Sequence, residues 1–151
     1  MKSVYKEAFM DMTCRFGETS RSTRLKVGAM LMKDGNPIAC GVNGTRAGWH
    51  TNVCEDSDGN TTPSVRHAEI AALDKLRRSN ETSVGATLFV SHSCCLPCAV
   101  EVVEAGIAHV IFKDLYRDDA GITYLASKGV TVEKIGDWII VDGHKRPCTA
   151  A

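Results

Sequence analysis

Residues 87–112 read TLFVSHSCCLPCAVEVVEAGIAHVIF, and the order of elements expected within them indicates the fold class. Its beginning, Thr87–Ser91, is an apolar run with the length and composition of a buried strand. A helix is expected over Pro97–Ala105, because proline suits a first helical turn and Gly106 suits a helix end. A second strand is expected over His109–Phe112. A strand, a crossover helix and a second strand predict two parallel neighbours in one sheet.

The flanking segments extend this unit into an α/β domain. The turn Asp34-Gly35-Asn36 separates two apolar runs and predicts a β-hairpin. Strands are expected over Val27–Met32, Pro37–Val42 and Val130–Lys134, and helices over 2–17, 66–78 and Asp118–Ser127. Together these elements predict a three-layer αβα fold around a mixed five-stranded sheet, with an antiparallel N-terminal hairpin and parallel later strands.

The C-terminal end and one long loop are less regular. Trp138–Val141 has the composition of an extra edge strand, and its place in the sheet stays open. Residues 1–142 are expected to form a single domain and 143–151 a frayed C-terminal tail. The loop from Asn43 to about Arg66 has no apolar periodicity. Such a long loop is usually functional, as a lid, an effector site or a subunit contact; a mobile insertion is the alternative.

Charge balance, apolar runs and cysteine content disfavour several classes of function. The 18 Lys and Arg residues balance 18 Asp and Glu residues, so the formal net charge is zero. This disfavours a grip on long DNA or RNA, whereas a small anionic substrate needs only a local basic cluster. No apolar run reaches membrane length, and no signal peptide is evident. The seven cysteines are therefore expected to be reduced thiols or metal ligands in the cytoplasm.

The residues that carry chemistry lie at two helix starts. Cys95 and Cys98 are three residues apart, so one helical turn brings both sulfurs to one point. The positive end of a helix also favours thiolates over thiols. One imidazole, from His67, and two thiolates can hold a zinc ion and leave its fourth position open to water. The pattern predicts a catalytic zinc site with these three ligands.

Glu69 is not needed as a ligand. Its expected role is to take a proton from the zinc-activated water, give it to a ring nitrogen, and later protonate the departing amine. Two simpler interpretations of these residues are possible on spacing alone. A redox C-x-x-C motif would leave His67 and Glu69 without a role. A purely structural zinc site would need a fourth protein ligand, for which the candidates are Cys94, His92, His50 and Cys54.

The H-x-E and C-x-x-C elements match a known signature of zinc nucleobase deaminases. From about Lys2 to Glu133 the sequence resembles the cytidine/deoxycytidylate deaminase superfamily, and most of all its deoxycytidylate (dCMP) deaminases, including viral ones. The matching blocks are Lys26–Ala29, Gly41–Gly48, His67–Glu69, Leu88–Cys98 and Ala105–Ile107. The N-G-T-x-x-G block within Gly41–Gly48 separates this branch from free cytidine deaminases and tRNA adenosine deaminases.

The resemblance implies a cytidine-deaminase-like fold, zinc on His67, Cys95 and Cys98, and Glu69 as the proton shuttle. It also implies that Asn43 hydrogen-bonds the deoxyribose. The expected substrate-binding residues are Asn43, Thr45, Ala68, Ser93, Lys113, Tyr116 and Arg117. The last three are placed to close over the sugar and the 5′-phosphate. Four other basic residues compete for the phosphate: Arg21, Arg24, Lys26 and Arg46.

Relatives of this kind are often hexamers that dCTP activates and dTTP inhibits, with a divalent ion on the triphosphate. The resemblance thus implies a homohexamer with dCTP and dTTP as possible effectors, the triphosphate carrying Mg²⁺. The expected effector-binding residues are Arg46, Gly48, Trp49 and His50. One zinc ion per chain is expected, because Cys54 and His50 lack a full ligand set for a second, structural zinc.

The sequence departs from the family pattern at Cys94, where relatives have proline. Either Cys94 or Cys95 can then be the first cysteine ligand, and Cys95 is preferred because it preserves the two-residue gap to Cys98. Arg46 also stands where relatives have proline, and it adds charge beside the nucleotide site. Ala71 stands where many of them have asparagine.

The predicted function is hydrolytic deamination of dCMP to dUMP and ammonia, supplying dUMP for thymidylate synthesis in the cytoplasm of the cell, or of the host for a viral protein. One alternative is a deaminase of another nucleotide or of an RNA base, against which the zero net charge and the N-G-T block count. Another is a zinc- or nucleotide-binding module without turnover. The presence of Glu69 argues against such a module.

Overall fold

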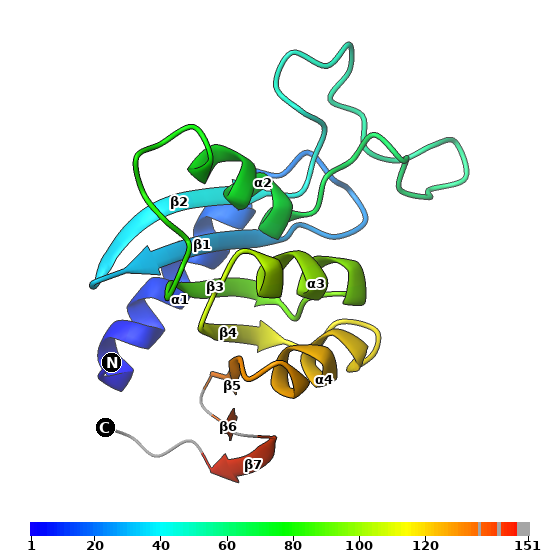
Figure 1. Ribbon diagram of the computed structural model, residues 1–151. Coiled ribbons are helices and arrows are strands. Elements are labelled where there is room, and N and C mark those ends of the chain that lie inside the picture. Colours follow the sequence, from blue (N-terminus) through cyan, green and yellow to red (C-terminus); the bar gives the residue numbers. More distant parts are fainter. Residues whose placement is uncertain (136, 142, 148–151) are drawn as a thin grey trace.

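The structure is a computed structural model that describes residues 1–135, 137–141 and 143–147 (Figure 1). Its helices are α1 (Ser3–Gly17), α2 (Ala68–Leu76), α3 (Leu96–Glu104) and α4 (Ala120–Ser127). Its strands are β1 (Gly28–Lys33), β2 (Asn36–Val42), β3 (Thr87–His92), β4 (His109–Asp114), β5 (Thr131–Lys134), β6 (Trp138–Val141) and β7 (His144–Pro147). The strands form one sheet in the order β2-β1-β3-β4-β5-β6-β7.

Helices cover both faces of this sheet. On one face, α2, α3 and α4 contribute Leu73, Val102 and Leu125 to a cluster of buried side chains that also includes Leu88 and Phe112 from the strands. On the other face, α1 packs its Met10 into a smaller cluster. The partners of Met10 there are Met30, Met32, Phe89 and Ile111. The predicted three-layer αβα architecture is therefore confirmed.

The strand directions also follow the prediction. β1 pairs antiparallel with both β2 and β3, whereas β3, β4 and β5 are parallel to one another. The hairpin between β1 and β2 turns at Asp34 and Gly35, whose φ values of 50° and 76° are both positive. Positive φ at both central positions matches the right-handed twist of the flanking strands, which is why Asp-Gly marks such a turn.

The expected number of five strands is wrong, because β6 and β7 extend the sheet to seven among the described residues. β6 pairs antiparallel with β5, and its Trp138 packs edge-on against Phe112 at 5.7 Å between ring centroids. β7 pairs with β6 and places Lys145 over the Trp138 ring at 4.6 Å. Part of the expected tail, 143–151, is thus a strand; residues 148–151 lie outside the described part.

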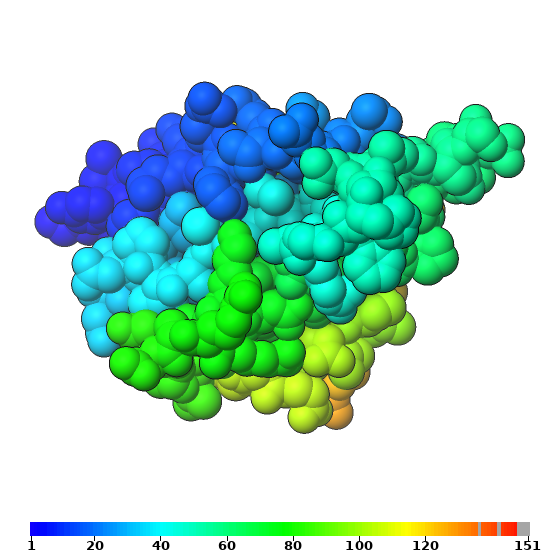
Figure 2. Space-filling view, turned by 90° about the horizontal axis from the view of Figure 1, so that it is seen from above, coloured from blue at the N-terminus to red at the C-terminus, as the bar shows by residue number. Residues whose placement is uncertain are grey.

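The long loop between β2 and α2 projects from the body of the domain (Figures 1 and 2). An antiparallel bridge between Gly44 and Arg66 closes its base, and a second bridge between Glu55 and Thr61 forms within it. No helix in the described residues has both the length and the apolar character that a bilayer crossing demands.

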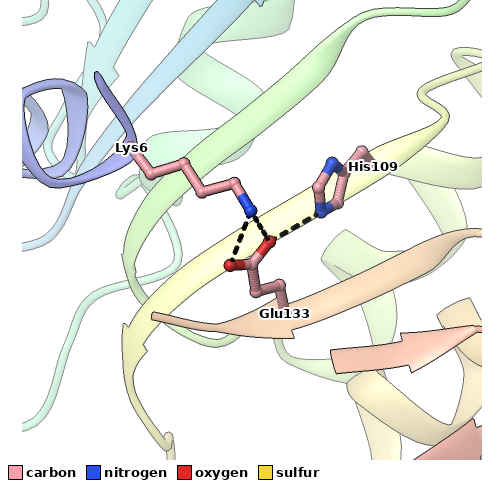
Figure 3. Close-up of polar contacts among 3 residues, drawn as sticks. All are labelled: Lys6, His109 and Glu133. Atoms are coloured by element: carbon pink, nitrogen blue, oxygen red, sulfur yellow. Dashed lines mark hydrogen bonds and ion pairs between the residues drawn. The ribbon is translucent and has the colours of Figure 1, made fainter. Parts of the chain in front are cut away.

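A buried carboxylate on β5 forms an ion pair with α1. Glu133 on β5 is 1% exposed, and Lys6 of α1 donates to both of its carboxylate oxygens at 3.1 and 3.0 Å (Figure 3). His109 of β4 approaches the same carboxylate at 3.3 Å. A carboxylate so far from water is stable only with charged or hydrogen-bonding partners, so this contact fixes where α1 lies.

Replacing Lys6 by Met should lower the free energy of unfolding by about 3 kcal/mol, because Glu133 then stays buried without the counter-charge that Lys6 supplies. The exposed Lys2→Met is the matched control and should change stability by less than about 0.5 kcal/mol. Urea unfolding of both variants measures the difference. Equal midpoints for Lys6→Met and Lys2→Met would show that this ion pair does not stabilise the fold.

Candidate active site

The predicted metal-binding side chains meet where α2 and α3 begin. His67 directly precedes α2, and Cys95 directly precedes α3, on which Cys98 lies one turn further. The Nδ1 atom of His67 is 3.3 Å from the Cys95 Sγ and 3.2 Å from the Cys98 Sγ. All three donor atoms lie within 4.8 Å of one another. Within the described residues, no other group of three His, Cys, Asp or Glu side chains has this spacing.

The electrostatics of this group favour a thiolate. Hydrogen bonds from Cys98 and His67 lower the pKa of Cys95 to about 4. The contact with Cys95 and burial together raise the pKa of Cys98, so the pair readily releases a single proton. The hydrogen bond with Cys95 in turn raises the pKa of His67. A thiolate at the start of a helix also benefits from the positive end of the helix dipole.

Cys94 takes no part in this group of donor atoms. Its side chain is only 1% exposed, and burial raises its pKa well above the usual range. Its thiol is instead hydrogen-bonded to Glu69. A Cβ at Gly121 of α4 would lie 2.0 Å from the Cys94 carbonyl oxygen, so α4 packs directly against this backbone. The geometry therefore places Cys95, and not Cys94, beside His67 and Cys98.

Glu69 lies in the first turn of α2, two residues after His67, and is 4% exposed. Burial raises the pKa of its carboxyl group, against the smaller opposing effects of hydrogen bonding and of the His67 charge. A raised pKa brings a carboxyl group closer to neutral pH, where it can both accept and release protons. The environment of Glu69 is thus suited to proton transfer.

The three donors fit a zinc ion. Two thiolates and an imidazole are ligands that zinc prefers, and three protein ligands are typical of catalytic sites with an open position. The other residues considered for a four-ligand structural site, namely Cys94, His92, His50 and Cys54, lie outside the donor group. The donor set and the adjacent buried carboxylate match the arrangement expected from the sequence.

A cavity of about 380 Å³ opens beside these residues, within the size range of small-molecule sites. It lies at the carboxyl ends of β3 and β4, where open α/β sheets bind ligands. Residues from the start of α2, from the loops after β2, β3 and β4, and from the segment before β1 line it. The lining residues are Ser22, Arg24, Leu25, Val27, Asn43, Thr61, Val65, His67, Ala68, Glu69, His92, Ser93, Cys95, Leu115, Tyr116 and Arg117.

Five of the seven expected substrate-binding residues line this cavity: Asn43, Ala68, Ser93, Tyr116 and Arg117. Thr45 does not, because its hydroxyl donates to the Thr51 carbonyl at 2.9 Å within the projecting loop. Lys113 does not either, because β4 continues to Asp114. Alternation along the strand puts Lys113 on the sheet face that α1 covers, where its charge acts on Cys14.

Asn43 and Ser93 also organise the backbone around the cavity. The side-chain oxygen of Asn43 accepts the Val27 N–H at 2.9 Å, and its amide group donates to the Leu25 carbonyl at 2.7 Å. The Ser93 hydroxyl accepts the Tyr116 N–H at 2.8 Å. Each residue therefore fixes a neighbouring cavity-lining segment in addition to lining the cavity itself.

The four basic residues that compete for the phosphate differ in where they lie relative to the cavity. Of Arg21, Arg24, Lys26 and Arg46, only Arg24 lines the cavity. Arg24 and Arg117 are the two arginines among the lining residues. Sequence reasoning missed Ser22, Leu25, Thr61, Val65 and Leu115 as lining residues. Their positions depend on loop conformations that no local pattern signals.

The residues expected to bind an effector lie in the projecting loop and outside the cavity. Arg46, Gly48, Trp49 and His50 are all absent from its lining. Trp49 is 46% exposed, and its ring contacts the His50 ring at 5.4 Å between centroids. An exposed pair of aromatic rings offers a surface on which a planar ring could stack.

Comparison with known proteins agrees with this geometry. The model of the cytidine and deoxycytidylate deaminase zinc-binding region matches residues 3–114. The chain belongs to this deaminase family. The match includes His67, Glu69, Cys95 and Cys98. This deaminase therefore has the zinc-binding region of an enzyme family, and within that region His67, Cys95 and Cys98 lie close enough together to hold a metal ion.

Among solved structures, this deaminase is similar to the dCMP deaminase of cyanophage S-TIM5 in complex with dCMP and dUMP. The two are 44% identical with a TM-score of 0.87, over 89% of this chain and 98% of that one. It is also 30% identical to the deoxycytidylate deaminase of Mycobacterium phage D29, over 70% of this chain and 91% of the relative. The yeast deoxycytidylate deaminase is 29% identical over 89% of this chain, which spans only 46% of that longer relative.

Proposed function

We propose that this protein is a zinc-dependent deaminase that converts dCMP into dUMP and ammonia. The observation that carries the proposal is a buried carboxylate, Glu69, beside a three-donor group in a cavity lined by two arginines. A zinc ion held by His67, Cys95 and Cys98 would supply an acidified water as the nucleophile. The similarity to phage dCMP deaminases supports the choice of substrate.

Glu69 carries the protons in this reaction. It accepts one proton from the attacking water and delivers it to N3 of the cytosine ring, while the water oxygen bonds to C4. It then moves the second water proton to the amine, and the C4–N4 bond breaks to release ammonia. The ring is left as uracil, with oxygen on C4 and hydrogen on N3. A single carboxylate can serve each step because its pKa is raised towards the working pH.

We assign the 5′-phosphate to Arg24 and Arg117, and the deoxyribose to Asn43 and Tyr116, with Ala68 and Ser93 completing the substrate contacts. Guanidinium groups bind phosphate through paired hydrogen bonds, which suits a nucleotide better than a free nucleoside. All of these residues line the one cavity that also contains Glu69. Lys113 and Thr45 are left out of the assignment because they lie elsewhere.

The finer parts of the proposal concern regulation and location. We propose a homohexamer in which dCTP with Mg²⁺ activates and dTTP inhibits, with effector contacts from Arg46, Gly48, Trp49 and His50. The exposed Trp49 and His50 rings support an effector site in the projecting loop. The cysteines of the described residues are free thiols, which suits the cytoplasm as the place of work. The dUMP produced would supply thymidylate synthesis.

One substrate panel tests the proposal against its alternatives. The zinc-loaded protein is assayed with dCMP, dCTP, cytidine, deoxycytidine and a cytidine-containing RNA oligonucleotide, with and without dCTP or dTTP. We expect ammonia release with dCMP at a kcat/KM far above that for deoxycytidine. Preference for the RNA or for another nucleotide would contradict the substrate assignment. Absence of ammonia with every compound would indicate a binding module without turnover.

The pH dependence of the reaction should reflect Glu69. Burial raises its pKa above the ordinary value of 4.5, and Glu69 accepts a proton only when ionised. We therefore expect kcat/KM to fall as the pH drops through this raised pKa, at a higher pH than an ordinary carboxylate would give. Rates between about pH 4.5 and pH 8 measure this, with bound zinc determined at each pH. A flat profile down to about pH 4.5 with zinc retained would contradict the role of Glu69.

A further inference from the structure

Glu55, in the projecting loop, accepts several hydrogen bonds from the segment before β1. One oxygen of its carboxylate, Oε1, accepts three hydrogen bonds. The Ser22 hydroxyl donates at 2.6 Å, the Thr23 N–H at 2.9 Å and the Arg24 N–H at 3.0 Å. These hydrogen bonds lower the pKa of Glu55, and the bond from Ser22 has the largest effect. The carboxylate of Glu55 is therefore ionised when it accepts them.

The segment that Glu55 holds has no regular structure of its own. It lies between α1 and β1, outside any helix or strand. The Ser22 N–H donates to the Ser20 hydroxyl at 3.2 Å, which itself donates to the Asn43 carbonyl at 2.7 Å. A loop without a backbone ladder takes its shape from such contacts, and Glu55 supplies three of them.

This segment also forms one wall of the cavity. Ser22 and Arg24 both line it, whereas Glu55 does not. Glu55 is itself held in place, because it bridges to Thr61 across a turn, and Thr61 also lines the cavity. The donor group and Glu69 lie at the starts of α2 and α3, so the contact of Glu55 involves the wall of the site and not its proton-transfer machinery.

We infer that Glu55 is a positioning residue: it holds the backbone from Ser22 to Arg24 so that the Arg24 guanidinium stays at the substrate cavity. The projecting loop thereby determines how tightly the phosphorylated substrate binds. This inference rests on the proposed dCMP deaminase activity and adds to it a residue outside the cavity that sets substrate affinity. Because Glu55 touches neither the donor group nor Glu69, its effect falls on KM and leaves kcat nearly unchanged.

The test compares Glu55→Ala and Glu55→Gln with Asp58→Ala, an exposed acidic residue of the same loop. Glu55→Ala should raise the KM for dCMP about tenfold with kcat within about twofold, the size expected for lost hydrogen bonds to a charged group. Glu55→Gln keeps an acceptor oxygen and should restore most of the affinity. The weak kcat/KM for deoxycytidine should not change, because that compound lacks the phosphate. Asp58→Ala should behave as the wild type.

A merely structural role would lower kcat and affect both substrates alike, and that result would overturn the inference, as would an unchanged KM for dCMP. Amide hydrogen exchange gives a readout that does not need turnover: the N–H groups of Thr23 and Arg24 should lose protection in Glu55→Ala. Unchanged protection would overturn the inference even if the wild type proved inactive. An inactive wild type would by itself contradict only the proposed dCMP deaminase activity.

Discussion

Replacing Glu69 by Gln should lower kcat for dCMP deamination by about three orders of magnitude, while the protein keeps its zinc ion. The amide has nearly the shape of the carboxylate but cannot accept a proton from water. Because Glu69 is buried and lies outside the donor group, its loss should not affect metal binding. Steady-state rates and metal analysis of the same purified sample measure both quantities.

Glu101→Gln is the matched control for Glu69→Gln. Glu101 is an exposed carboxylate on α3 and does not line the cavity, so its kcat should equal that of the wild type. A kcat for Glu69→Gln within about tenfold of the wild type would mean that another group carries the protons. A large loss of activity accompanied by a loss of zinc would assign Glu69 to metal binding.

Replacing Cys95 by Ala should remove both the zinc and the activity, whereas Cys94→Ala should keep the zinc. The sulfur of Cys95 is 3.3 Å from the His67 Nδ1, and Cys94 is absent from the donor group. With two ligands left, zinc affinity should fall by at least about a hundredfold, because each thiolate contributes a full bond to the metal. Zinc content after dialysis against a mild chelator measures the difference between the two variants.

Cys94→Ala tests the alternative that the sequence left open. Its thiol is buried and hydrogen-bonded to Glu69, so its removal should lower stability by about 1 kcal/mol and change kcat modestly. Loss of zinc in Cys94→Ala with retention in Cys95→Ala would reverse the ligand assignment. Zinc retained in both variants would mean that either cysteine can complete the site.

The parts of the fold that follow from local chemistry could be predicted. The Asp34-Gly35 hairpin and the strand-helix-strand unit over residues 87–112 need only turn residues and apolar runs, and both are present. β7 could not be predicted, because His144–Pro147 carries no alternating apolar residues. It forms a strand because its backbone pairs with the free edge of β6 and because Lys145 packs over the Trp138 ring.

The residues of the site also fall into those that the sequence could predict and those that it could not. Spacing was enough to find four residues of the site, His67, Glu69, Cys95 and Cys98. His67 and Glu69 lie within one helical turn of each other, as do Cys95 and Cys98, so helix geometry brings the two members of each pair close together. The cavity wall could not, because Ser22 and Arg24 take their positions from Glu55, more than thirty residues away in the sequence. The apolar run His109–Phe112 predicts Lys113 beyond the strand, but β4 runs one residue past Lys113 and places its side chain on the other face of the sheet.

The reaction of the zinc-loaded protein with dCMP in water enriched in ¹⁸O tests the proposed deamination at the atoms that change. We expect one ammonia released for each dUMP formed, with the heavy oxygen on C4 of the uracil ring. That result would show that water is the nucleophile and that the exocyclic amine is the leaving group. If the zinc-loaded protein releases no ammonia from dCMP, the proposed deaminase activity is wrong.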